Sequence, residues 1–435
     1  MSGIRFVDLF AGIGGIRKGF ENAFQKKGVS TTCVFTSEIK PSAIKVLQEN
    51  HPEDTINGDI SKIKESSIPD FDFLLAGFPC QAFSYAGKRL GFADTRGTLF
   101  FEVERILKAK KPFGFLLENV EGLVSHDKEN PSDTIGRTFS TILSKLEAQG
   151  YHVTWRVLNA RNFGLAQDRK RIYIAGVKKG LVDLDGFVNT TATLGEILEK
   201  GLPTEDSLIV NLLLSHFKPE QLYGKSIKDK RGGEDNIHSW DLELKGAVSP
   251  EQKELLSAMA RERRKKKWAE EHGIKWMDGM PLTEKQIRTF FDHPQLHNLL
   301  EDLVKKGYLK KEHPKDLVEE YTIMGTQIVR KQNPNLPLGY NIVAGKLSFG
   351  ISKVLSPDGI APTLVAMDMK KNYVVDNGGL RPLSLREGLR LFGYPEDFKF
   401  TVSNGEGYDL LGNTVAVPVI ESVAERIYNE WIKNQ

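Results

Sequence analysis

The sequence predicts an α/β fold, a doubly wound and mostly parallel sheet with helices on both faces, together with a second, smaller domain. Three observations predict it. Strand-like and helix-like segments alternate through the first 180 residues, which is the order of a parallel sheet covered by helices. Between residues 187 and 346 this alternation is lost and charge becomes dense. Near residue 354 the order returns, and the chain ends in an amphipathic helix that needs a sheet face to cover.

The N-terminal elements can be placed in order along the chain. The first strand is expected at residues 4–10, followed by a glycine turn at 11–15 and a helix to about residue 26. Further strands are expected at 32–37, 71–78, 113–117, 151–157 and 171–177, and helices at 42–50, 98–108 and 137–149.

The C-terminal part is expected to complete the same domain. Residues 361–365 read as a short strand and residues 383–392 as a helix. The final helix carries an apolar stripe at steps of three and four, typical of a core-facing surface: Val417, Ile420, Val423, Ile427 and Trp431. We therefore expect residues 1–186 and 347–435 to form one domain, with the last helix packed on the N-terminal sheet, and residues 187–346 to form the other.

The middle segment is expected to be helical at residues 251–271, 284–291 and 295–306. This order resembles a winged helix with 295–306 as its recognition helix, although a small helical subdomain that merely packs fits the sequence better.

A basic run lies in the same segment, with six basic residues in seven at 261–267. Two interpretations remain open. The run is either the solvated face of a helix or a surface that follows phosphates.

Composition is that of an ordinary globular protein: 435 residues, 40% hydrophobic and 27% charged, with a net charge of +3. No apolar run approaches the roughly 18 residues of a membrane span, and the N-terminus lacks a signal-peptide layout. We therefore expect a cytoplasmic protein without membrane contact. Two cysteines exclude a disulfide framework and a cysteine-rich zinc site.

The glycine turn after the first strand is typical of a nucleotide-cofactor site, because glycine lets the backbone turn sharply and approach a ligand. No Gly-Lys-Ser/Thr follows, so it is not a phosphate loop. Glu38, at the end of the next strand, can accept hydrogen bonds from a ribose, and Asp59 from an adenine amino group. A nicotinamide enzyme fits these features as well as a methyltransferase does.

A second motif, Gly77-Phe78-Pro79-Cys80-Gln81, follows an apolar strand and should lie at the carboxyl edge of the sheet, where open α/β folds bind ligands. The loop position and the preceding proline favour an accessible Cys80 thiol, which is a strong nucleophile once deprotonated. Cys33, inside a strand, is expected to be a small buried hydrophobe.

Two polar motifs end at the same edge. Glu118 closes the strand at 113–117, where burial disfavours the charged carboxylate, and a protonated carboxyl can donate to a ring nitrogen. Gln167, Arg169 and Arg171 alternate along an extended segment and so share one side. Each motif alone also fits a structural ion pair or a solvent-facing basic run.

Together these segments resemble the cytosine-5 DNA methyltransferase family. The matching motifs come in the family's order and cover about residues 1–180 and 354–435: Phe6-Val7-Asp8-Leu9-Phe10-Ala11-Gly12-Ile13-Gly14-Gly15, Gly77-Phe78-Pro79-Cys80-Gln81, Glu118-Asn119-Val120, Gln167-x-Arg169-x-Arg171, Arg381-Pro382-Leu383-Ser384, Phe392-Gly393-Tyr394-Pro395 and Leu411-Gly412-Asn413-Thr414. The resemblance implies a Rossmann-like methyltransferase fold, S-adenosylmethionine as cofactor with S-adenosylhomocysteine as product, no metal, and duplex DNA as substrate. It makes 187–346 the target-recognition domain.

The resemblance also implies roles for single residues. Cys80 is the implied nucleophile at cytosine C6, Glu118 the acid at N3 and the exocyclic amine, and Arg171, with Arg169 beside it, the partner of O2 and the Cys80 loop. Cofactor contacts are implied for Phe10, Ala11, Gly12, Gly14, Glu38, Ile39, Asp59, Ile60, Pro79, Leu99, Asn413 and Thr414. DNA contacts are expected for Gln81, Ser84, Arg96, Gln167, Arg263, Arg264, Lys265 and Lys266.

These groups fit one reaction. Thiolate addition at C6 makes C5 nucleophilic enough to attack a sulfonium methyl, and the base must be flipped out of the duplex to reach the pocket. We expect a monomer that modifies DNA in a bacterial restriction-modification system, alongside a cognate endonuclease it need not contact. Transfer to tRNA cytosine, a catalytically silent DNA-binding protein and a nicotinamide oxidoreductase are the alternatives.

Overall fold

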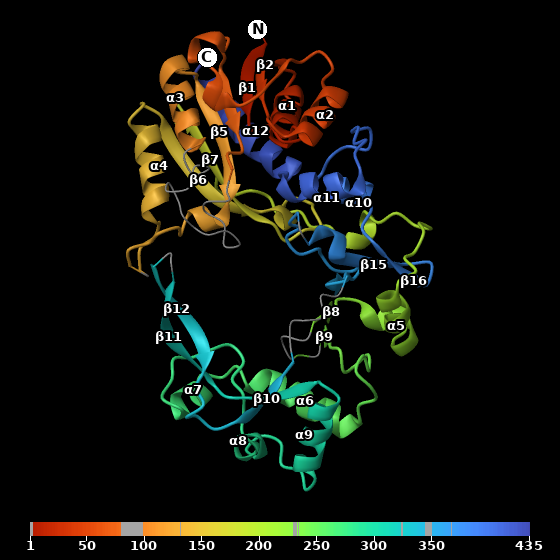
Figure 1. Ribbon diagram of the computed structural model, residues 1–435. Coiled ribbons are helices and arrows are strands. Elements are labelled where there is room, and N and C mark those ends of the chain that lie inside the picture. The colour runs from red at the N-terminus through yellow and green to blue at the C-terminus, as the bar shows by residue number, and fades with distance from the viewer. Residues whose placement is uncertain are drawn as a thin grey trace. The chain divides into compact units, whose positions relative to one another are not determined.

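The computed structural model describes residues 3–79, 99–130, 132–228, 233, 235–322, 325–343, 350–366 and 368–435. The chain forms two compact units (Figure 1). The first comprises Met1–Lys200, Ser356–Lys370 and Leu383–Gln435, and the second Gly201–Leu355 and Lys371–Pro382. The boundaries differ from the expected ones at 186 and 346, and the return of Lys371–Pro382 to the second unit has no counterpart in the sequence pattern.

The first unit is built on a seven-stranded sheet, ordered β3-β2-β1-β4-β5-β7-β6. Its strands are β1 (Ile4–Leu9), β2 (Thr31–Ser37), β3 (Ile56–Asn57), β4 (Phe73–Ala76), β5 (Gly114–Val120), β6 (His152–Asn159) and β7 (Lys170–Val177). Strands β1 to β5 run parallel, and β7 is antiparallel to both β5 and β6. The predicted mostly parallel sheet is confirmed. Its strand order reverses between β1 and β4, and the carboxyl ends of strands at such a point form a ligand crevice.

Helices cover both faces of this sheet. One core joins α1 (Gly15–Gln25) and α12 (Val417–Lys433) to one face, and a second joins α3 (Phe100–Lys110) and α4 (Arg137–Glu147) to the other (Figure 1). The same unit also contains α2 (Pro41–Asn50), α10 (Leu385–Leu391) and α11 (Asn404–Asn413).

The C-terminal helix α12 packs against α1. All five residues of its expected stripe are buried. The two helices approach closely at Gly19, where a Cβ atom would lie 2.6 Å from the Cβ of Ile420. The last part of the chain therefore supplies one covering layer of the N-terminal sheet.

The second unit has two cores of its own. One is formed by α6 (Pro250–Glu262), α7 (Lys267–Glu271), α8 (Glu284–Arg288) and α9 (Leu296–Lys305) with the paired strands β10 (Leu309–Glu312) and β13 (Gly339–Ile342). The other places α5 (Leu208–His216) on a sheet ordered β16-β15-β14-β8-β9, whose strands are β8 (Ser226–Ile227), β9 (Asn236–Ile237), β14 (Lys353–Val354), β15 (Asn372–Asp376) and β16 (Gly379–Pro382). A separate hairpin consists of β11 (Lys315–Thr322) and β12 (Gly325–Gln332).

Two expected elements differ in the structure. The single helix at 251–271 is broken into α6 and α7 at the basic run, because Arg263 turns into the core at that point. The expected strand at 361–365 makes only an isolated bridge, in which Ala361 N–H donates to the carbonyl of Ala166 and its own carbonyl accepts from Asp168.

Within the described part of the chain, none of the helices combines the length and apolarity needed to cross a bilayer.

Candidate active site

The glycine turn between β1 and α1 is built from left-handed backbone conformations. Phe10 has φ 56°, and Gly12 and Gly14 have φ 56° and 81°. This conformation is uncommon for a side chain such as that of Phe10 and persists where the surroundings enforce it, often at a functional site.

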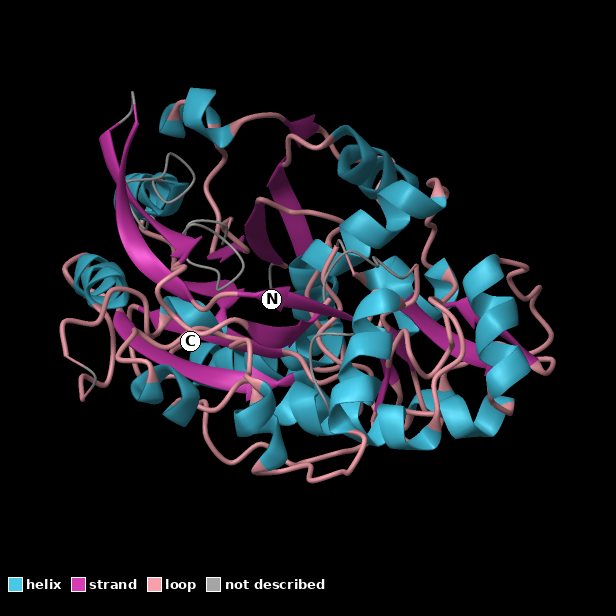
Figure 2. Cartoon of the chain, turned by 60° about the horizontal axis from the view of Figure 1, so that its bottom comes forward, coloured by secondary structure: helices cyan, strands magenta, loops and turns pink. Residues whose placement is uncertain are grey.

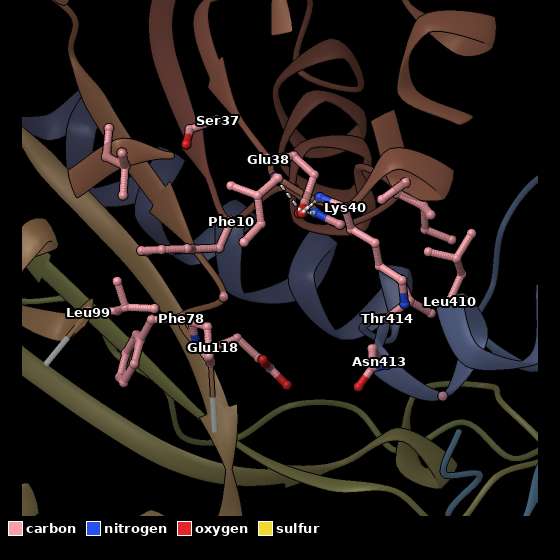
Figure 3. A pocket seen from close by; sticks show the side chains of 18 of the residues that line it. Phe10, Ser37, Glu38, Lys40, Phe78, Leu99, Glu118, Leu410, Asn413 and Thr414 are labelled. Atoms are coloured by element: carbon pink, nitrogen blue, oxygen red, sulfur yellow. Dashed lines mark hydrogen bonds between the residues drawn. The ribbon is translucent and has the colours of Figure 1, made fainter. Parts of the chain in front are cut away.

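Glu38 fixes this turn from the end of β2. Its Oε2 accepts from Gly12 N–H at 2.7 Å, and its Oε1 accepts from the N–H groups of Ile39 and Lys40 at 2.8 and 2.9 Å (Figure 3). A carboxylate offers about four lone-pair positions. Glu38 therefore holds the backbone in place and keeps the capacity for a ligand hydroxyl.

A pocket of about 570 Å³ opens beside the turn, within the first unit (Figure 3). This volume suits a nucleoside-sized ligand. Ten of the twelve expected cofactor residues line it: Phe10, Gly12, Glu38, Ile39, Asp59, Ile60, Pro79, Leu99, Asn413 and Thr414. Ala11 and Gly14 are not among the lining residues.

Asp59 lies on the same pocket and caps a short 3-10 turn. Its Oδ1 accepts from the hydroxyl and the N–H of Ser61 at 2.7 and 3.0 Å. These hydrogen bonds hold the pKa of Asp59 below its ordinary value, so the side chain faces the pocket as a carboxylate acceptor.

Other lining residues were not expected from the sequence, among them Lys40 and Leu410. Lys40 pairs with Asp409 on α11, so an ion pair joins the N-terminal and C-terminal parts of the pocket rim. Leu410 precedes Asn413 by one helical turn, a spacing that could have marked it. No local signal points to the Lys40–Asp409 pair.

Glu118 and Arg171 meet at the other end of the pocket. The antiparallel pairing of β5 and β7 sets Val120 opposite Arg171. The Nε atom of Arg171 lies 3.3 Å from Glu118 Oε1. Burial raises the pKa of Glu118 above its usual range, although Arg171 and Arg169 pull it down. The site therefore presents a carboxyl that can carry and donate a proton.

Arg169 lies beside this pair, but its guanidinium is engaged with backbone. It donates to the carbonyls of Leu364 at 3.0 Å and Thr414 at 2.6 Å, and stacks over the ring of Phe392 at 5.0 Å. Arg169 was expected beside Arg171 in the catalytic set, and it does line the pocket. Its contacts hold the pocket wall at residues 412–414, while its part in catalysis stays a prediction.

Gln167 was expected to contact DNA, and the structure contradicts this. Its side chain is fully buried and donates to the carbonyl of Leu391 at 3.1 Å. Alternation correctly placed Gln167 on the same side as Arg169. That side is covered by the returning C-terminal segment, which the alternation does not reveal.

Within the basic run, the expected DNA contact of Arg263 is corrected. Arg263 is buried and donates to Asn341 Oδ1 at 2.6 Å, so it is unavailable to a phosphate. Arg264 pairs with Asp278 at 2.7 Å and Lys265 pairs with Glu262, whereas Lys266 is exposed.

Four expected site residues, Cys80, Gln81, Ser84 and Arg96, lie outside the described residues. The residues just before Cys80 are placed: Pro79 lines the pocket, and Phe78 is held through its carbonyl by the Asn119 side chain at 3.0 Å. For Cys33, burial raises the pKa of its thiol to about 12, as suits the inert cysteine that was expected.

The pocket fits the implied cofactor. Phe10, Ile39 and Ile60 provide apolar surface for an adenine ring, and Glu38 and Asp59 provide acceptors for hydroxyl and amino groups. These contacts suit an adenosine group.

Known proteins similar to this chain are methyltransferases. The family model for C-5 cytosine-specific DNA methylases matches residues 4–429. The Type II methyltransferase M.NlaIV of Neisseria lactamica is 60% identical over 427 residues, which cover 98% of this chain and 99% of the relative. The Type II methyltransferase M.BanI of Aneurinibacillus aneurinilyticus is 41% identical over 450 residues, covering 98% of this chain and 96% of the relative.

Among solved structures, the Entamoeba histolytica methyltransferase EhMeth superimposes with a TM-score of 0.54 at 14% identity, covering 99% of each chain. At this identity the likeness supports the fold alone.

Proposed function

The chain belongs to the C-5 cytosine-specific DNA methylase family, and on this premise we propose that it methylates C5 of a cytosine in a specific sequence of duplex DNA, with S-adenosylmethionine as donor. One observation carries the proposal. A buried acid with a raised pKa, Glu118, shares one pocket with the nucleoside-type acceptors Glu38 and Asp59. A base and an adenosyl cofactor can therefore meet in that pocket.

Cys80 is proposed as the nucleophile. Its thiolate forms a bond to C6 of the flipped base; the π pair of the C5=C6 bond becomes the C4=C5 bond, and the C4=N3 pair moves to N3, which takes a proton from Glu118. C5 then uses the C4=C5 pair to bond the methyl carbon of the donor, whose carbon–sulfur pair stays on its sulfur, and the N3 proton returns to Glu118 as the C4=N3 bond re-forms. Loss of the C5 proton to a water re-forms the C5=C6 bond and expels the Cys80 thiolate from C6.

Glu118 supports this addition. As a carboxylic acid it donates a proton or hydrogen bond to N3, where charge develops, and accepts from the exocyclic amine. Arg171 orients Glu118 through the contact between its Nε and the carboxyl, and it is the proposed partner of O2.

S-adenosylmethionine, when bound, supplies an electrophilic methyl group. The proposed contacts are Glu38 with the ribose, Asp59 with the adenine amino group, and Phe10, Ile39 and Ile60 with the ring faces, while Asn413 and Thr414 form the wall that Arg169 holds.

The biological setting follows from the relatives. M.NlaIV and M.BanI are named Type II methyltransferases and align over nearly their whole length with this chain. We therefore infer that the protein is the modification enzyme of a restriction-modification system. That it acts as a monomer stays a prediction from the sequence. The segment 187–346 is inferred to recognise the target sequence.

The test is transfer of labelled methyl from S-adenosylmethionine to unmethylated duplex DNA and, in parallel, to tRNA. Cys80→Ala serves as the blank. Label at C5 of cytosine in DNA, absent from the blank, is the expected result. Label in tRNA alone would assign an RNA substrate, and DNA binding without label in either substrate would indicate a silent binding protein.

A further inference from the structure

The hairpin β11–β12 stands apart from the cores of its unit. Its eight residue pairs run from Lys315 opposite Gln332 to Thr322 opposite Gly325, and among the described strands it pairs with no third one. Figures 1 and 2 show it as a ribbon that projects from the helical part of the second unit. A two-stranded ribbon is marginally stable in isolation, so it depends on an anchor at its base.

The anchor is the segment that follows the basic run. Arg330 of β12 donates to the carbonyls of Trp276 at 2.8 Å and Lys275 at 3.4 Å. Trp276 in turn donates from Nε1 to the carbonyl of Arg264 at 3.0 Å. These contacts join the ribbon, the exposed tryptophan and the basic run into one surface.

A buried network supports the same base. Asn341 of β13 accepts from Arg263 and donates to Glu312, the last residue of β10 before the ribbon, at 2.6 Å in each case. Arg263 is therefore not available at the surface, but its hydrogen bond to Asn341 helps to hold Glu312 at the base of the ribbon.

One face of the ribbon exposes side chains suited to recognition. Ile328 is 68% exposed and shares its face with Arg330, because side chains two apart in a strand point the same way. Glu319, directly opposite Ile328, is also exposed. At the base, Trp276 is 41% exposed, and its carbonyl accepts from Arg330 of the same face.

Two lysines lie in the segments that these hydrogen bonds join to the ribbon. Lys266 and Lys275 are exposed, and neither has an acidic partner within salt-bridge distance in the described part of the chain. We call the group Lys266, Lys275, Trp276, Glu319, Ile328 and Arg330 the ribbon face.

We propose that the ribbon face enters the major groove of duplex DNA and reads base edges there, while Lys266 and Lys275 contact backbone phosphates. The proposal rests on the proposed function and names the element that recognises its substrate. The major groove, about 12 Å wide, admits a two-stranded ribbon. In it a carboxylate such as that of Glu319 can accept from the amino group of cytosine, and an apolar side chain such as that of Ile328 fits a thymine methyl. Contacts to base edges give sequence specificity, and the two lysines would add electrostatic attraction to the backbone phosphates.

The first arm of the test measures DNA binding without catalysis. Binding of a fluorescent plasmid-derived duplex is followed by anisotropy over a salt series for the wild type, Lys266→Gln and Lys275→Gln. Each variant is expected to lower the slope of log K against log salt by about one. Lys305→Gln, an exposed lysine on α9 of the same unit, is the control and should keep the wild-type slope.

The second arm measures which cytosines are methylated. Plasmid DNA modified by each variant is read by bisulfite sequencing. Ile328→Ser and Glu319→Gln are expected to lower the ratio of methylation in the wild-type sequence context to methylation elsewhere by about tenfold. Leu208→Ser, at a position 85% exposed on α5, is the matched control and should leave the ratio unchanged.

The outcomes separate the two proposals. If the wild type methylates DNA but the ribbon variants keep both its salt slope and its sequence context, the ribbon inference is wrong and the proposed function stands. If the wild type binds DNA without methylating it, the proposed function fails and the salt series still decides the role of the ribbon face. If the wild type does not bind DNA, both are refuted.

Discussion

Glu118 combines two properties that are usually opposed, since it lies beside an arginine and yet its pKa is raised. Arg171 alone would lower the pKa of this carboxyl, but burial outweighs the arginine. The side chain is therefore oriented by a cation while it keeps the ability to hold a proton. That combination suits a group that must both donate to a ring nitrogen and stay in one place.

Glu118→Gln should lower the rate of methyl transfer by about 100- to 10,000-fold, the usual value of a positioned acid. In the wild type, activity should fall as pH rises through the raised pKa of Glu118, because the protonated carboxyl is lost. The variant should lack that descending limb. Single-turnover rates across a pH series measure both effects. Glu121→Gln, an exposed position on the same stretch, is the control, and a wild-type rate in Glu118→Gln would contradict the assignment.

Arg169→Met should weaken S-adenosylhomocysteine binding by about tenfold, because the carbonyl of Thr414 in the wall at 412–414 loses its donor, which costs about 1–3 kcal/mol. Arg169→Lys should recover part of the affinity. Titration calorimetry gives the dissociation constants, with exposed Arg161→Gln as control. A purely catalytic arginine would leave cofactor affinity unchanged and lower only the rate.

At the scale of elements, the end of β1 carries a buried carboxyl group. Asp8 is fully buried, and neither carboxyl oxygen has a hydrogen-bond partner among the described residues. Burial raises the pKa of Asp8 to about 8; Arg17 opposes this shift, and Glu21, Glu38 and Asp54 add to it. The folded protein therefore binds a proton here that the unfolded chain has lost.

Asp8→Asn should remove the resulting pH dependence. Between the unfolded pKa of 3.8 and the folded pKa of about 8, the folded state binds more protons, so wild-type stability falls as pH rises through this window. Relative to the wild type, the free energy of unfolding of Asp8→Asn should rise across the same pH range and exceed that of the wild type by most above it. Thermal unfolding of both proteins at a series of pH values measures this, and a constant difference in Tm would contradict the burial argument.

Gly19→Ala separates helix propensity from packing. Propensity alone predicts a gain of about 0.8–1.0 kcal/mol for alanine within a helix. A Cβ at Gly19, however, would lie 2.6 Å from Ile420 and 2.8 Å from the carbonyl of Val417, and overpacking of this kind costs about 1–3 kcal/mol. We therefore expect a net loss of stability by chemical denaturation. Gly405→Ala on α11, where an added Cβ would have no atom within 4 Å, is the control and should not destabilise.

The elements also show which sequence signals can be relied on. The end of β2 before Glu38 was predictable, because an apolar run that stops at a polar residue is a local signal. The strand expected to end before Glu118 instead continues to Val120, because pairing with β7 extends it. The burial of Gln167 and Arg263 was not predictable, because alternation and charge density do not show which later segment covers a side chain. The hairpin β11–β12 was missed because its strands mix charges with apolar residues on both faces.

For the whole molecule, each unit has its own hydrophobic cores. The candidate cofactor pocket lies entirely in the first. Scanning calorimetry should therefore show two transitions, of which S-adenosylhomocysteine raises only one. At 100 times its dissociation constant the ligand should stabilise that unit by about 2.7 kcal/mol. Glu38→Gln should reduce this shift, and a ligand-induced rise of both transitions together would show that the units unfold as one.

At this scale the fold class and the family were predictable, because ordered motifs from both ends of the chain occur together. The exact division of the chain into two units was not predictable. The segment Lys371–Pro382 joins the second unit because its strand β15 pairs with β14. The two strands are separated in the sequence, and no local pattern predicts that they pair.

The packing of α12 on α1 has a consequence for synthesis of the chain. The ribosome completes β1, α1 and the rest of the N-terminal sheet long before it makes the helix that covers one of its faces. Until then an apolar surface stays open, and the pocket lacks the wall formed by Asn413 and Thr414. An exposed apolar surface of this kind makes an incomplete chain prone to aggregation. The candidate pocket is therefore complete only when the last helices have been made and have packed.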